Sequence, residues 1–471
     1  MKKTTALIMT GCLAGMLAAC GNTQNTTAIS AAADGAEPTG SASAASAQAP
    51  ADNGKPTEIV FWNSFTGEIY KTLEEIIAEY NASQNKVHVT SQFQGTYDET
   101  LTKFKSSMAS GSGPDVLHMY EAGTRYMLDS GYAVPVQDYA AADGFDLNQL
   151  NDMARSYYTV DHALWSMPFN YGQAVLFYNK TAFEEAGLDP ESPPRTYAEF
   201  KDAAQKLMVK KNGKVTRYGA TISVYGWFME QLIAGQGKLY VNNDNGRSGR
   251  ATALEADKNG ALLNVFKEWQ SFAKQESVVN FGKDLSAGYQ AFVAGKVAML
   301  PFVSGYYNYA TAAINGKFKL GVGYFPMLDK TAEGGSLLAG ASFWMIDHKD
   351  EAKKKASWEF IKYMASKEVQ AKWTLRTGDI AINKGSYEMP EVQDYLKVNP
   401  AIQVSLNQEK AYPNNNFTQG AVFGVMPEAR LSFEENMDKI LAGAQTPEQA
   451  TEKFAADVNK SLADYNASIG K

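Results

Sequence analysis

The stretch IVFW (residues 59–62) opens the folded part of the chain with four apolar residues in a row, which predicts a buried strand. Apolar residues then recur at helical spacing over residues 69–80, and alternation over residues 87–91 predicts a second strand. A helical pattern at 101–108 and the apolar run VLHM (residues 116–119) continue the series. Strand and helix alternate at βαβ spacing, which is typical of an α/β fold with largely parallel strands.

Long helical patterns recur further along the chain. Thr196 and Glu199 form a capping-box pattern that predicts the start of a helix. Helices are also predicted near residues 260–276, 351–376 and 447–466. Residues 58–471 are more than one core usually covers, so we expect this part of the chain to form two lobes.

The N-terminus has the features of an export and anchoring signal. Lys2 and Lys3 precede an apolar run over residues 6–19 that is too short to span a bilayer and is typical of a secretory signal. The run ends in LAACG (residues 17–21), which resembles the lipobox of bacterial lipoproteins. Residues 1–19 are therefore a predicted signal peptide, and the thiol of Cys20 is the predicted site of lipidation.

Residues 20–57 form a predicted tether. They are rich in Ala, Ser, Thr, Gly, Asn and Gln and contain no aromatic residue, so they cannot bury enough apolar surface to offset the entropy of ordering. Together with the lipid anchor, this segment indicates a protein held at the extracytoplasmic face of the cell membrane.

Composition and spacing argue against several kinds of chemistry. The chain has 44 Lys and Arg against 51 Asp and Glu, a net charge of −7, so nucleic acid is not an expected partner. Two cysteines and four histidines offer no disulfide framework and no metal-ligand spacing, so we expect neither metal nor cofactor. The calcium-like stretch VNNDNG (residues 241–246) lacks ligands in the required frame and is predicted to be a turn.

From residue 110 onward the sequence resembles a known family. SGSGPD (from Ser110), followed by VLHMYEAGT, is similar to family 1 extracellular solute-binding proteins of ABC importers. Five further blocks follow in the family's order: SMPFNYGQAVLFYNKTAFEEAGLDPESPPRTY (from Ser166), YGWFMEQ (from Tyr225), LAGASFWMI (from Leu338), TGDIAIN (from Thr377) and GVMPEARLSF (from Gly424).

The resemblance implies an α/β, two-lobed fold of the periplasmic-binding-protein type II kind. Segments near 168–180 and about 300–345 would cross between the lobes, with the ligand in the cleft between them. It also implies a monomer that binds without catalysis, with permease subunits and an ATPase as partners on other chains.

Within that family the layout resembles glycerol-3-phosphate-binding proteins, which implies a set of ligand contacts. The positions carried over are Tyr97, Glu121, Ser304 and Gly340, with Tyr171 or Gly172 at the place of a serine. Position in the predicted elements adds Asn63, Ser64, Asn170, Trp227 and Trp344 to the candidates. Glu230, in contrast, is predicted to be a surface or capping residue.

Two departures from the pattern decide the predicted ligand. Asp379 stands where the family has a tyrosine, and Val422 or its neighbour stands where an arginine meets the phosphate, with no arginine replacing it locally. A site that loses a bidentate cation and gains a carboxylate is unfavourable for a dianion.

We therefore hypothesise a neutral, hydroxyl-rich ligand, which is most simply a mono- or oligosaccharide. The alternative within the class is glycerol-3-phosphate or a glycerophosphodiester. Two alternatives from other functional classes stay open. One is a lipoprotein glycosidase, and the other is a sensor or adhesin that takes no part in transport.

Overall fold

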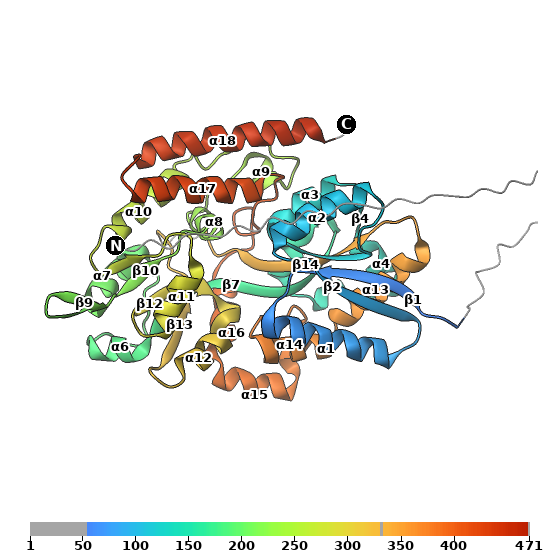
Figure 1. The fold of residues 1–471 in the computed structure, drawn as a ribbon, viewed down its shortest axis with the longest axis horizontal. Coiled ribbons are helices and arrows are strands. Elements are labelled where there is room, and N and C mark those ends of the chain that lie inside the picture. The colour runs from blue at the N-terminus through green and yellow to red at the C-terminus, as the bar shows by residue number, and fades with distance from the viewer. Residues whose placement is uncertain (1–53, 330–332, 470–471) are drawn as a thin grey trace, which may run out of the picture. The chain divides into compact units, whose positions relative to one another are not determined.

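Two long strands cross the middle of the folded body (Figure 1). The computed structural model describes residues 54–329 and 333–469. The first half of β7 (Met167–Asn179) pairs with β14 (Leu338–Ile346), whereas its second half is flanked by β12 (Met299–Val303) and β13 (Leu320–Tyr324). One continuous strand therefore belongs to two groups of strands. The predicted two-lobed α/β fold with crossing segments is confirmed.

The first lobe is built around β1, which lies between β2 and β3, and β14 then joins β3 to β7. Its elements before the crossing are β1 (Thr57–Asn63), α1 (Gly67–Ser83), β2 (Val87–Phe93), α2 (Tyr97–Ala109), β3 (Val116–Tyr120), α3 (Thr124–Asp129), β4 (Ala133–Val134), α4 (Val136–Asp143), α5 (Asp152–Tyr158), β5 (Thr159–Val160) and β6 (Ala163–Leu164), with short 3₁₀ turns η1 (Glu121–Gly123) and η2 (Leu147–Gln149). After β14 the chain returns to this lobe with α13 (Glu351–Met364), α14 (Lys367–Thr377) and the turn η4 (Lys384–Glu388).

The second lobe holds the remaining elements. They are α6 (Lys180–Glu185), α7 (Tyr197–Leu207), β8 (Val209–Lys211), β9 (Lys214–Arg217), β10 (Ala220–Ile222), α8 (Gly226–Gly235), α9 (Asn242–Gly246), α10 (Ala261–Ala273), β11 (Val278–Asn280), α11 (Leu285–Val293), η3 (Ser304–Tyr306) and α12 (Tyr307–Ile314), then α15 (Pro390–Val398), α16 (Pro400–Ala411), α17 (Met426–Leu441) and α18 (Pro447–Ser468). Helices α17 and α18 lie side by side and pack with α10, as Figure 1 also shows.

The expectation of largely parallel strands is correct only in part. β1 runs parallel to β2 and β3, and β10 runs parallel to β11. β14 runs antiparallel to both β3 and β7, and β12 and β13 run antiparallel to β7. The local βαβ pattern at the start of the chain could not reveal these pairings, because the paired residues are about 120 to 230 positions apart in the sequence.

The predicted helices are confirmed, with one change. Thr196 and Glu199 form a reciprocal capping box at the start of α7. The pattern over residues 351–376 is two helices, because Ser366 interrupts the first and caps α14 through the N–H of Val369.

The core is continuous between the lobes. One apolar cluster includes Phe61 and Phe343 in the first lobe and Phe228 and Phe325 in the second. A smaller cluster lies on the other side of the second half of β7, around Phe177. Alternate residues of β7 therefore pack in two different cores, because successive side chains of a strand point to opposite faces.

The calcium-like stretch forms a turn. Residues 243–245 have φ between +51° and +59°, so the calcium-like stretch is a left-handed turn, as the sequence predicts. None of the helices in the described part of the chain is both long and apolar enough to cross a membrane. Cys20 and most of the predicted tether lie outside the described residues.

Candidate functional site

Polar side chains gather where β3 ends and β7 begins. Tyr97 starts α2, and its ring stacks on that of Tyr120 with centroids 5.0 Å apart. His118 Nε2 lies 2.9 Å from Oδ1 of Asn170. Burial lowers the pKa of His118 to about 4, so the ring is neutral at physiological pH, and Nε2–H donates to Asn170. Burial raises the pKa of Tyr97, a hydrogen bond with Asn170 opposes the shift, and the charge of Glu121 adds to it.

A buried arginine is shared by two carboxylates beside this group. Arg430, on α17, donates from Nη2 to Glu121 Oε1 (2.8 Å) and to Glu230 Oε2 (2.9 Å), and from Nε to Glu230 Oε1 (2.7 Å). Burial raises the pKa of Glu121, although Arg430 opposes the shift. Burial alone would lower the pKa of Arg430, but the charges of Glu230 and Glu121 raise it well above its usual value. Glu121 belongs to the first lobe, so this triad joins the two lobes.

Asp379 supplies a carboxylate without a cation. Its Oδ2 accepts a hydrogen bond from Trp373 Nε1 (3.0 Å), and burial raises its pKa to about 6. Across the described ranges, no Lys, Arg or His pairs with it. A Cβ on Gly305 would lie 2.3 Å from Asp379 Oδ1, so this carboxylate lies directly against the backbone of the second lobe.

Ser304 and Gly340 support the backbone between these groups. Ser304 is fully buried, and its hydroxyl accepts from the N–H of Gln173 at 3.1 Å. Gly340 has φ 139°, and a Cβ there would lie 1.9 Å from the carbonyl oxygen of Asn170. Glycine therefore permits the close approach of β14 to β7 that presents Asn170.

Two predicted candidates at the end of β1 are engaged within the first lobe. Asn63 is fully buried and donates to Ser91 Oγ at 3.0 Å. The hydroxyl of Ser64 lies 2.8 Å from that of Thr100. No hydrogen bond within the described residues links either side chain to Tyr97, His118 or Asn170.

Three predicted aromatic candidates pack inside the protein. Tyr171 is 1% exposed, and its hydroxyl donates to Glu409 Oε2 at 3.1 Å. Trp227 donates from Nε1 to the carbonyl of Leu338 at 3.1 Å. Trp344 is fully buried in the core, where its Nε1 has no partner among the described residues. Its strand is covered on both faces, so the alternation of Phe343 and Trp344 does not separate a core side from an open side.

Sequence reasoning missed Arg430 and misplaced Glu230. Val422 is a core residue, and the arginine that reaches the site lies eight positions later. Glu230 is 6% exposed and is bound to that arginine, so its prediction as a surface or capping residue is wrong. One signal was available: Arg430 lies at helical spacing from Met426 and Phe433, and a charge on the apolar face of a helix requires a buried partner.

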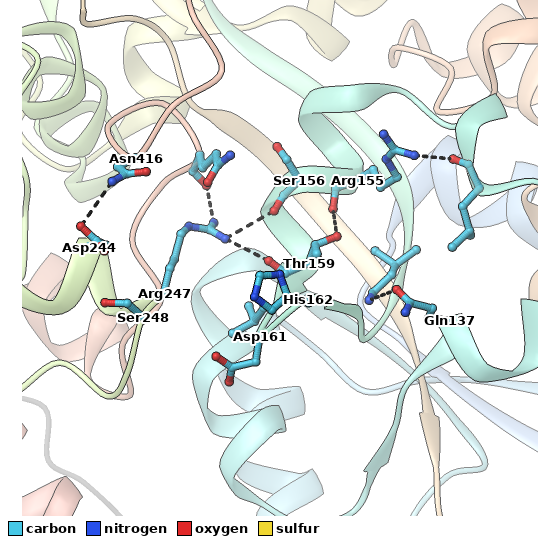
Figure 2. A pocket seen from close by; sticks show the side chains of 14 residues that line it. Gln137, Arg155, Ser156, Thr159, Asp161, His162, Asp244, Arg247, Ser248 and Asn416 are labelled. Atoms are coloured by element: carbon cyan, nitrogen blue, oxygen red, sulfur yellow. Dashed lines mark hydrogen bonds between the residues drawn. The ribbon is translucent and has the colours of Figure 1, made fainter. Parts of the chain in front are cut away.

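A cavity of about 810 Å³ lies elsewhere and is shown in Figure 2. Its lining includes Arg155, Asp161, His162, Asp244, Arg247 and Asn416. The guanidinium of Arg247 donates to the carbonyls of Ser156, Tyr157, Thr159, Gln419 and Gly420. The polar groups at this cavity largely bind one another, and the sequence gives no prediction for it.

The described ranges hold no group of three or more His, Cys, Asp or Glu that could bind a metal ion. What the site offers is a set of hydrogen-bond donors and acceptors between two lobes: the hydroxyl of Tyr97, the amide of Asn170, the Arg430 guanidinium and the carboxylates of Glu121 and Asp379. Such a set can hold a polar small molecule by hydrogen bonds.

Comparison with known proteins agrees with this geometry. A family model described as bacterial extracellular solute-binding protein matches residues 66–371. The sn-glycerol-3-phosphate-binding periplasmic protein UgpB of Pectobacterium atrosepticum is 30% identical over 420 residues, which cover 88% of this chain and 93% of that protein.

Two solved structures have a similar fold. An ABC substrate-binding protein from Listeria monocytogenes in complex with cycloalternan has a TM-score of 0.72 at 20% identity, covering 87% of this chain and 100% of that one. UgpB from Mycobacterium tuberculosis in complex with glycerophosphocholine has a TM-score of 0.71 at 18% identity, covering 87% and 99%. With the family match and the 30% identical relative, these findings identify the chain as a member of the bacterial extracellular solute-binding protein family.

Proposed function

We propose that this protein is the substrate-binding component of an ABC importer and that it captures a neutral carbohydrate between its lobes. The balance of charge at the site is the observation that supports a neutral ligand. The guanidinium of Arg430 is already shared between Glu121 and Glu230, and Asp379 has no cation within the described residues. A dianion would add like charge to this cleft, whereas sugar hydroxyls donate well to carboxylates.

The groups around the cleft suit a polyhydroxylated ligand. Asp379 and Glu121 are acceptors, Tyr97 offers a hydroxyl beside a stacked aromatic pair, and Asn170 is held in place by His118. These groups come from the first lobe and the crossing strand β7, whereas Arg430 comes from the second lobe. Closing the lobes around a ligand would therefore complete its hydrogen bonds.

The predicted signal peptide and lipidation site indicate where in the cell the protein would act. A lipid on Cys20 would hold the protein at the outer face of the cell membrane, next to the permease that receives the ligand. Replacing this cysteine (Cys20→Ala) should move the protein from the membrane fraction to the soluble fraction without changing ligand affinity. Retention of the variant in the membrane fraction would contradict lipid anchoring at this position.

A second candidate ligand is glycerol-3-phosphate or a glycerophosphodiester. One specific observation favours it: among the described residues, none accepts a hydrogen bond from Nη1 of Arg430. That N–H pair could meet a phosphate oxygen. The named relative binds glycerol-3-phosphate, which supports the same candidate.

Thermal unfolding of the purified protein against a ligand panel tests the two candidates. The panel holds mono- and oligosaccharides, glycerol-3-phosphate and glycerophosphocholine. A ligand at 100 times its dissociation constant adds about 2.7 kcal/mol of stability, which is a shift of a few degrees in a protein of this size. A shift with saccharides alone is the expected result.

The pH dependence of binding sharpens the same test because the pKa of Asp379 is about 6. For a saccharide, lowering the pH from 7.5 to 5 protonates this acceptor, so affinity should fall several-fold. For glycerophosphocholine, whose phosphate keeps a single charge, the same protonation removes a like charge, so affinity should rise. Asp379→Asn should abolish either trend. Binding of phosphate compounds alone, tighter at pH 5, would overturn the carbohydrate proposal in favour of the second candidate.

A further inference from the structure

One exposed aromatic residue adjoins the candidate site. Within residues 54–329 and 333–469, the large hydrophobic side chains that stay exposed are Phe93, Tyr306, Val398 and Leu431. Tyr306 is 44% exposed and ends the turn η3, directly after Ser304 and Gly305. A single exposed apolar residue is ordinary in a soluble protein, so its surroundings decide whether it has a role.

The ring of Tyr306 is held by three other aromatic rings. Its centroid lies 4.9 Å from that of Phe302 at an interplanar angle of 83°, 5.9 Å from Tyr289 at 69°, and 5.9 Å from Tyr309 at 53°. Edge-on packing of this kind fixes the orientation of a ring while leaving part of it open to solvent. A ligand that stacks on a ring already fixed in this way loses little side-chain entropy on binding.

The turn that carries Tyr306 also lies against the carboxylate of Asp379, which has no cation as a partner among the described residues. Gly305 approaches Asp379 so closely that a Cβ would lie 2.3 Å from Oδ1, and a Cβ on Gly378 would lie 3.3 Å from Asn308 Nδ2. The segments 304–308 and 377–379, which come from different lobes, are therefore in contact. The charge of Asp379 adds to the effect of burial in raising the pKa of Tyr306. An acceptor for hydroxyl groups and an open aromatic ring thus stand next to each other.

We propose that Tyr306 is a stacking platform for a second sugar ring, so that the ligand is an oligosaccharide and not a single sugar. This inference rests on the proposed carbohydrate function and extends it. One ring would bind among the polar groups near Asp379, and the next would lay its C–H face on Tyr306, which matches the apolar faces of pyranose rings. A ligand with one ring or a short phosphate compound would leave Tyr306 exposed.

Isothermal titration of the full-length protein with saccharides of increasing length tests the proposal. The probes are mannose, mannobiose and mannotriose, and glucose, maltose and maltotriose. In the series that binds, we expect the di- or trisaccharide to bind at least about tenfold more tightly than the single sugar. Tyr306→Ala should weaken oligosaccharide binding about tenfold and leave monosaccharide binding unchanged, since stacking contributes on the order of one tenfold step.

Two variants serve as matched controls. Tyr306→Phe keeps the ring and should bind both lengths like the wild type. Leu431→Ala removes an exposed apolar side chain on α17 and should change nothing. Because Tyr306 packs on three rings, its alanine variant should melt a few degrees below the wild type, so binding is compared well below both melting temperatures. Tyr309→Ala provides a second disruption of the platform.

The outcomes separate this inference from the proposed function. Equal affinity for both lengths, or an equal effect of Tyr306→Ala on both, would overturn the platform and leave the carbohydrate function standing. If no saccharide binds and only the phosphate compounds do, the carbohydrate function fails, and the platform fails with it.

Discussion

Two arginines, one buried and one half-buried, serve different regions of this molecule. Arg430, near the cleft, is bound to the carboxylates of Glu121 and Glu230, whereas Arg247, near the 810 Å³ cavity, is bound to backbone carbonyls. Burial lowers the pKa of Arg247 to about 10, and the carboxylates raise the pKa of Arg430 well above its usual value. The same side chain is thus held by full charges in one region and by dipoles in the other.

The different partners indicate different roles for the two arginines. Arg247 joins the end of α5 to residues 419–420, which suits a structural role, and its guanidinium lies 5.2 Å above the ring of Tyr157. Arg430 forms ion pairs with carboxylates from two lobes, so the strength of these ion pairs depends on whether the carboxylates are ionised. A ligand that changes this balance acts on Arg430 and not on Arg247.

The largest effect is expected for Arg430→Gln. This change leaves two buried carboxylates without a cation, and breaking a buried pair from one side costs about 3–5 kcal/mol. Because burial raises the pKa of Glu121 and the change removes the cation that opposes this shift, the variant should regain stability as the pH falls from 8 to 5. Urea unfolding at several pH values measures this, and Glu230→Gln combined with Arg430→Gln should recover part of the loss. A pH-independent loss would contradict the role in charge balance.

Arg247→Met should cost less, about 2–3 kcal/mol, because the freed carbonyls border a cavity where water can reach them. The loss should not depend on pH between 5 and 8, since no carboxylate among the described residues pairs with the guanidinium. Ligand affinity should stay at the wild-type value. A change in affinity as large as that of Arg430→Gln would show that the two regions are coupled.

Asp379→Asn tests how a buried carboxylate without a cation affects stability. The folded-state pKa of Asp379 is raised from 3.8 to about 6, so its protonated form is favoured in the folded protein. Its contribution to stability is full below pH 4 and is lost as the pH rises through 6. The asparagine variant should therefore be more stable than the wild type above pH 7, by up to about 3 kcal/mol, and should lack this pH dependence. Thermal unfolding from pH 4 to 8 measures both.

The smallest effect is expected for Arg155→Ala at the rim of the cavity. Its side chain is 31% exposed and pairs with Asp152, which is 59% exposed. Exposed pairs contribute about 0–1 kcal/mol, so urea unfolding should change little, and the change should shrink further in 0.5 M salt. A loss as large as that of Arg247→Met would mean that the two arginines act as one network.

Much of the fold was predictable because it depends on local patterns. Helices such as α7 and the turn at 243–245 follow from capping and turn residues, which act within a few positions. The antiparallel course of β14 was not predictable, because its partners are chosen by the packing of two lobes. For the site, Tyr97, Glu121, Asn170 and Asp379 were predicted and come together, while Trp344 and Tyr171 point into the core.

The sequence alone determined the family resemblance, the order of the early elements and the unusual carboxylate at position 379, since each is written in a short stretch of residues. Only the tertiary structure decided that Arg430 is held between Glu121 and Glu230, and that the open ring of Tyr306 stands beside Asp379. Those contacts join residues between 73 and 309 positions apart, and burial removes the water that would otherwise screen them. Charge balance at the site is therefore a property of the packed lobes and not of any single motif.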